Sequence, residues 1–95
     1  MSPTHHLQPQ ITVLYFAAAS TATGLTSEAV PLPSGTPFPL SSLAEVLASR
    51  HPDTGLDRVL ASSQWSVDAE MVDDPESVSL KGGEEVAVIC PVSGG

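Results

Sequence analysis

Basic residues are scarce in this 95-residue chain. Arg50, Arg58 and Lys81 are its only arginines and lysines, and they face 11 acidic residues, which gives a formal net charge of −8. Proteins that bind nucleic acid or anionic membranes use lysine and arginine to neutralise phosphate, so this balance argues against both classes. It is equally compatible with simple solubility and with a basic partner surface.

Cysteine and long apolar runs are also scarce. Cys90 is the only cysteine, which excludes an intramolecular disulfide and a cysteine-based zinc site. The longest apolar candidate, residues 11–19, is about half the ~18–20 residues that span a membrane. The sequence shows no secretory hydrophobic segment, so we expect the protein to be located in the reducing cytosol. Residues 1–9 hold two prolines and no arginine or lysine, and we predict a disordered arm rather than a mitochondrial presequence.

Two runs are apolar on both faces of an extended chain, and they lie at opposite ends of the sequence. They cover residues 11–16 and 86–90. Strands of this kind belong in the middle of a sheet, so the first and last strands are both expected to be central. Residues 28–32 predict a second strand, in which Pro31 and Pro33 indicate either an edge strand or a strand end. Residues 20–26 between them read as a loop.

One convincing helix is expected in the middle of the chain. Ser42 and Glu45 have the spacing of a capping box, and Pro52 sets the end of the helix. Its apolar stripe consists of Leu40, Leu43, Val46 and Leu47.

A short helical turn (54–62), a strand (64–71), another short strand (77–80) and a tight turn (81–84) should follow. A hairpin, a crossover helix and returning strands make an α+β fold with a mixed sheet and one main helix packed on one face. This is a β-grasp domain over residues 10–90, followed by a flexible tail over residues 91–95.

Side-chain chemistry offers little for catalysis. His5 and His6 are adjacent on an extended arm, so their side chains diverge. We therefore expect no metal site there. His51 ends the main helix, where it suits the helix dipole. Cys90 has no neighbouring histidine in sequence that would activate it, so we interpret it as a half-buried structural thiol. We therefore expect no catalytic side chain and no bound metal.

The C-terminal segment is the candidate functional site. It consists of Pro91, Val92, Ser93, Gly94 and Gly95. Glycine has no Cβ, so such a backbone can thread a narrow channel and present its terminal carboxylate in a partner's pocket. A carboxylate becomes a good electrophile once it is joined to AMP, and a sulfur nucleophile can then displace the AMP. The fold and the Gly-Gly end are independent features that point to the same function.

Residues 81–95, Lys-Gly-Gly-Glu-Glu-Val-Ala-Val-Ile-Cys-Pro-Val-Ser-Gly-Gly, resemble the C-terminal signature of the small subunit of molybdopterin synthase, a ubiquitin-like sulfur carrier. The resemblance extends over residues 10–95, but only the tail is specific. Cys90 stands where the family usually has proline, and Asp68 where it often has asparagine. Neither departure affects the Gly-Gly end.

The resemblance implies a mechanism and partners. A ubiquitin-activating-enzyme-like adenylyltransferase and sulfurtransferase would use ATP to adenylate Gly95 and then convert it to a thiocarboxylate. The tail would insert into the synthase large subunit, in a complex of two small and two large subunits. There it would supply sulfur to cyclic pyranopterin monophosphate, forming molybdopterin. No cofactor would be bound stably, and the chain would act as a sulfur donor without catalytic side chains of its own.

Two alternatives remain open from the sequence. One keeps the carrier chemistry but changes the acceptor, as in a ubiquitin-related modifier for tRNA thiolation or a thiamine-pathway carrier. The other is a ubiquitin-like domain that only binds partners and has an inert tail. ATP-dependent activation by the partner enzyme separates the second class from the carriers.

Overall fold

The computed structural model describes residues 9–32 and 37–90. Five strands form the main sheet in the order β2-β1-β7-β4-β5. Their bounds are Gln10–Tyr15 (β1), Ser27–Pro31 (β2), Gln64–Val67 (β4), Glu70–Val72 (β5) and Glu85–Ile89 (β7). The helices are Ala17–Thr23 (α1), Leu43–Arg50 (α2) and Leu56–Ala61 (α3). The remaining elements are the strands Phe38–Pro39 (β3) and Ser79–Leu80 (β6), which pair with each other, and the 3-10 turns Leu40–Ser42 (η1) and Pro75–Ser77 (η2).

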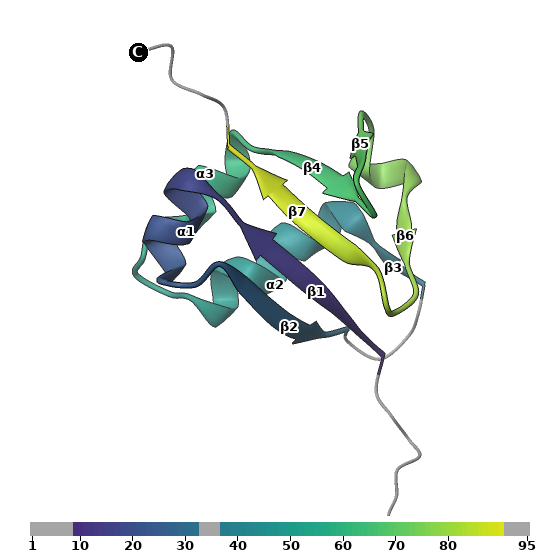
Figure 1. Ribbon diagram of the computed structural model, residues 1–95, viewed down its shortest axis with the longest axis horizontal. Helices are drawn as coiled ribbons and strands as arrows, with labels where there is room; N and C mark the ends of the chain where they lie inside the picture. Colours follow the sequence, from purple (N-terminus) through teal and green to yellow (C-terminus); the bar gives the residue numbers. More distant parts are fainter. Residues whose placement is uncertain (1–8, 33–36, 91–95) are drawn as a thin grey trace, which may run out of the picture.

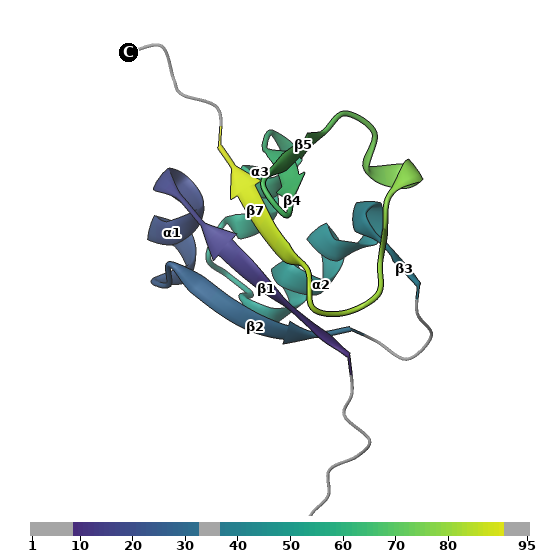
Figure 2. The same cartoon turned by 45° about the vertical axis from the view of Figure 1, so that its right-hand side comes forward.

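The first and last strands are both central, as the sequence predicts, and the structure pairs them as parallel neighbours (Figure 2). Strand β2 lies at one edge, which is one of its two predicted placements. Helices α2 and α3 lie behind the sheet in the view of Figure 1. The helix-facing side chains of β1 and β7 are almost fully buried; they are Ile11, Val13, Tyr15, Val86 and Val88. This arrangement confirms the α+β, β-grasp architecture.

The main helix is confirmed, but its predicted capping box is wrong. Leu43 and Leu47 of α2 are fully buried, and the helix ends at Arg50, two residues before Pro52. Ser42 makes no capping hydrogen bond. The 3-10 turn η1 leads directly into α2, so Ser42 already has helical backbone angles (φ −89°, ψ −7°). A capping side chain needs an extended backbone to turn back to the free N–H groups.

The loop predicted over residues 20–26 is also wrong, because helix α1 occupies most of it. Its sequence begins with three alanines, which favour helix, and Ala19 is fully buried. The first strand correspondingly stops at Tyr15. Gly24 ends the helix in the left-handed conformation (φ +74°).

The predicted strand over residues 64–71 is two strands joined by a tight turn. Asp68 (φ +50°) and Ala69 (φ +73°) are its two central residues, and two positive φ values are typical of a type I′ hairpin. The Asp68 carboxylate accepts the N–H of Glu85 at 3.0 Å, which ties the turn to β7. The strand predicted over residues 77–80 shrinks to β6 and pairs with β3, outside the main sheet.

Candidate functional site

The predicted site residues Pro91, Val92, Ser93, Gly94 and Gly95 lie outside the described residues, as does most of the predicted arm over residues 1–9. Pro9 is described, and its carbonyl accepts the Leu32 N–H at 2.8 Å. The structure defines the site up to its base at Cys90, the residue that follows the central strand β7.

The base of the tail is held where three elements end. The Cys90 thiol donates to the carbonyl oxygen of Phe16 at 3.3 Å, just beyond β1. The Ser63 hydroxyl, just beyond α3, lies 3.8 Å from the Cys90 sulfur. The thiol is half-buried and packs against the core. Cys90 therefore fixes the point at which the tail leaves the sheet.

The face of the sheet turned away from α2 and α3 carries a row of side chains that is apolar except for Ser66, and Ala87 and Ser66 within it are buried. Leu14, Ala87, Ser66 and Met71 are cross-strand neighbours on this face, one strand after another. Phe16 is 49% exposed and Met71 is 54% exposed. Exposed apolar patches on small proteins commonly mark interaction sites. We call this surface the open face, and it extends to the base of the tail.

A cluster of polar groups lies on the helix-facing side of β2. Glu28 Oε1 accepts the Tyr15 hydroxyl at 2.7 Å and lies 2.9 Å from Nε2 of His51, while Glu28 Oε2 accepts Nε of Arg50 at 2.9 Å. The rings of Tyr15 and His51 meet edge to face, with centroids 6.1 Å apart. His51 stands at the end of α2 as predicted, and its side chain contacts the Glu28 carboxylate of β2.

The cluster shifts the pKa of two of its members. Burial opposes the charge of Glu28, but the hydrogen bonds from His51, Tyr15 and Arg50 outweigh it and hold the pKa of Glu28 below its usual value. Burial, and then the hydrogen bond to Glu28, raise the pKa of Tyr15 well above its usual value. Because Tyr15, Arg50 and His51 all contact the Glu28 carboxylate, the cluster connects β2 to the end of α2. Sequence reasoning missed it, since Glu28 lies more than 20 positions from Arg50 and His51 and no spacing links them.

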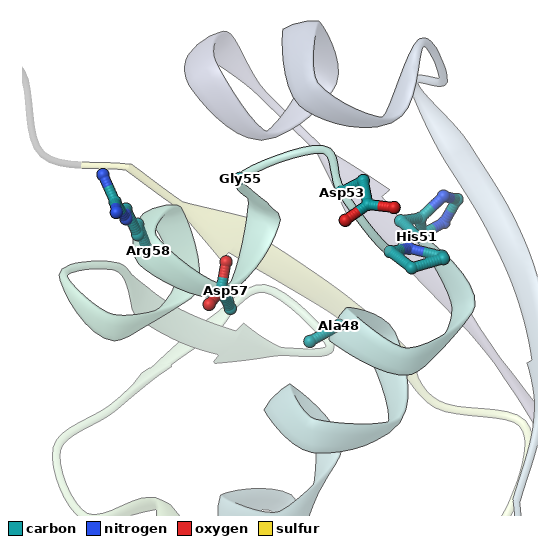
Figure 3. Close-up of a pocket in the computed structure, with 7 residues that line it drawn as sticks. Ala48, His51, Asp53, Gly55, Asp57 and Arg58 are labelled. Atoms are coloured by element: carbon teal, nitrogen blue, oxygen red, sulfur yellow. The ribbon is translucent and has the colours of Figure 1, made fainter.

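A pocket of about 500 Å³ lies between α2 and α3, and Figure 3 shows the residues that line it. His51, Asp53, Asp57 and Arg58 contribute its polar side chains. Arg58 is directed away from Asp53 and His51 in this view, and the lining offers no nucleophile for a neighbouring base to activate. Within the described ranges, no group of three or more His, Cys, Asp or Glu side chains is placed to hold a metal ion. His5 and His6 lie outside those ranges.

None of the helices in the described part of the chain has the length and apolar character needed to cross a bilayer.

A β-grasp domain with an apolar open face and a C-terminal tail leaving its central strand is the architecture of ubiquitin-like carriers. The ThiS family matches residues 13–95. A molybdopterin synthase sulfur carrier subunit of Mycosarcoma maydis is 46% identical over 89 residues, covering 92% of this chain and 95% of the relative. The chain therefore belongs to the ThiS family, among the sulfur carrier subunits of molybdopterin synthase.

Solved structures agree with this assignment. A protein from Pyrococcus furiosus, assigned as molybdopterin converting factor subunit 1, superposes with a TM-score of 0.71 at 25% identity, covering 88% of this chain and 99% of that one. In a complex of subunits 1 and 2 of the molybdopterin-converting factor from Helicobacter pylori, the matching chain gives a TM-score of 0.62 at 17% identity. The match covers 90% of this chain and 99% of that one, and it supports the fold.

Proposed function

We propose that this chain carries sulfur as a thiocarboxylate on Gly95 and delivers it for the synthesis of molybdopterin. The observation that supports this most strongly is the attachment point of the C-terminal segment at Cys90. Cys90 follows directly after the central strand β7, and the five residues after Cys90 end in Gly-Gly. The names of the relatives point to the same role.

The chemistry takes place on the terminal carboxylate. An activating enzyme transfers AMP from ATP to the Gly95 carboxylate and releases pyrophosphate. The outer sulfur of a persulfide on that enzyme attacks the carbonyl carbon, and AMP leaves. Reduction of the sulfur–sulfur bond by a thiol then frees the Gly95 thiocarboxylate. In this scheme the chain supplies the reactive terminus and the partners supply ATP and the catalytic groups.

The complex that accepts the sulfur contains a synthase large subunit. It is assembled from two small and two large chains in the cytosol. Three observations support such a partner. The related Helicobacter pylori protein was solved as a complex of its subunits 1 and 2, and the open face presents Phe16 and Met71 as exposed apolar anchors. The net charge of −8 complements a large subunit that must hold a phosphorylated pterin with basic groups. Its substrate is cyclic pyranopterin monophosphate, and two sulfur deliveries complete molybdopterin.

Deletion of Gly95 tests the proposal. The deletion should leave the melting curve unchanged, because the buried residues of the described core lie between Ile11 and Val88. The carboxylate would then lie one residue short of the chemistry, so adenylation and thiocarboxylate formation should stop. Intact-mass analysis with the activating enzyme, ATP and a sulfur donor should show one oxygen replaced by sulfur in the wild type but not in the deletion variant.

Cys90→Ser is the matched control, because it changes the only thiol and keeps a hydroxyl that can reach the Phe16 carbonyl. This variant should gain sulfur nearly as well as the wild type. Sulfur gain by the Gly95 deletion would refute the carrier function, and loss of transfer by folded Cys90→Ser would show a thiol role. A thiocarboxylate that the large subunit does not accept would favour a carrier for another pathway.

A further inference from the structure

Strand β5 leaves one edge of the main sheet unpaired. It is the last strand in the order β2-β1-β7-β4-β5 (Figure 1). The Asp68 N–H donates to the Glu85 carbonyl of β7, so Trp65 and Val67 of β4 turn their backbone groups toward β5. Their partners there are Val72 and Glu70, and the intervening Met71 must therefore point its N–H and C=O outward. Within the described residues neither group has a hydrogen-bond partner.

Two grooves meet along this edge, and both are lined by Met71, Val72 and Asp73. One, of about 520 Å³, extends toward the end of α3 and Trp65. The other, of about 470 Å³, extends toward the residues after η2, where Val78 forms part of its wall. The edge therefore lies open between two partly apolar grooves.

The charged side chains that line the two grooves are all acidic. Carboxylates lining the second groove are Asp68, Glu70, Asp73 and Asp74. None of the chain's three basic residues lines either groove. A segment that docks here gains by bringing basic side chains, and an acidic segment is repelled. Met71 also belongs to the open face, so a partner on that face would continue into this edge.

We infer that the outer edge of β5 is a docking strand for an extended, basic segment of the synthase large subunit. The segment adds to the sheet through the backbone N–H and C=O of Met71 and covers its side chain. It places lysine or arginine beside Glu70 and Asp73. Such strand addition takes affinity from main-chain hydrogen bonds and specificity from the flanking side chains. The inference rests on the proposed function and adds a second contact surface next to the open face.

Titration of the large subunit with four variants of the full chain tests the inference. Glu70→Gln combined with Asp73→Asn should weaken binding by about tenfold at low salt and flatten its salt dependence. Glu45→Gln combined with Asp57→Asn removes the same charge from α2 and α3 and should bind like the wild type. Met71→Pro removes the outward N–H and spares the bonds to β4, so it should also bind about tenfold more weakly. Met71→Ala tests the side chain alone.

Hydrogen exchange provides an independent measurement in the wild-type complex. The Met71 amide should exchange freely in the isolated chain and become protected when the large subunit binds. Unchanged exchange at Met71, with wild-type affinity of the Glu70/Asp73 double variant, would overturn the inference even if Met71→Pro failed to fold. Weaker binding by a fifth variant, Phe16→Ala, in the titration would then show that the open face alone docks, with the proposed function intact. A thiocarboxylated chain that neither binds nor supplies sulfur to the large subunit would refute the proposed function itself.

Discussion

Glu28 shows how one residue can connect two layers of the fold. Its side chain is only 12% exposed, yet it stays charged because Tyr15, His51 and Arg50 all direct polar hydrogens or nitrogen atoms at its oxygens. Removal of one partner from such a cluster costs more than an exposed ion pair would, because the remaining groups stay desolvated. The edge strand β2 is thereby attached to the end of α2.

The Glu28→Gln variant should be less stable than the wild type at neutral pH by about 1–3 kcal/mol, because it loses charge-assisted hydrogen bonds. The folded state lowers the pKa of Glu28 from its ordinary value of 4.5. Its contribution is therefore fully present above that value and is lost as the pH falls through the lower, folded-state pKa. Denaturant unfolding at several pH values should show the gap between the two proteins closing below about pH 4.5. Glu45→Gln, on the exposed side of α2, should show no comparable gap.

Among the helices and strands, the sequence predicts the ones whose spacing of apolar residues is set by burial in the core. Strands β1 and β7 and helix α2 carry apolar residues at spacings that only one buried arrangement satisfies. Leu14 and Phe16 make the first run apolar on both faces, and in the structure Leu14 lies on the open face and Phe16 is 49% exposed. An apolar side chain that awaits a partner looks the same in sequence as one that is buried in the fold.

The missed elements are short, and their conformation depends on the rest of the fold. Helix α1 has seven residues and is too short to form alone, so its packing on α3 and the burial of Ala19 decide its conformation. The β4–β5 turn has alanine at a position where glycine is the usual signal, so the hairpin was not visible in the sequence. The tail residues were predicted from chemistry, and the structure describes only their attachment point at Cys90.

The turn residue Ala69 gives a prediction at this scale. Its φ of +73° is disfavoured for residues with a Cβ, and glycine adopts it freely. Ala69→Gly should therefore raise the free energy of unfolding by about 0.5–1 kcal/mol, measured by denaturant titration. Gly24→Ala, which places a Cβ in the same backbone region at φ +74°, should lower it. Destabilisation by Ala69→Gly would mean that the turn does not hold this conformation in solution.

Packing of α2 on the sheet gives a second prediction for the elements. Leu43 and Val88 are fully buried, one on the helix and one on the central strand. Leu43→Ala and Val88→Ala should each lower the free energy of unfolding by roughly 1–4 kcal/mol, because each leaves a cavity. Leu25→Ala serves as the control, since Leu25 is 37% exposed and the variant should unfold like the wild type. Wild-type melting of both core variants would contradict the helix-on-sheet packing.

For the whole molecule, stability and function belong to different parts of the chain. The buried residues of the described core lie between Ile11 and Val88, whereas the proposed chemistry takes place on Gly95. Gly94→Leu should therefore melt like the wild type, yet fail to reach the active sites of its partners, because a branched side chain must enter a channel suited to bare backbone. Val88→Ala should do the opposite, with a lower melting temperature but normal sulfur transfer by the folded fraction. Intact mass and molybdopterin formation, measured beside the melting curves, separate the two effects. Normal transfer by Gly94→Leu would show that the tail acts without entering a narrow channel.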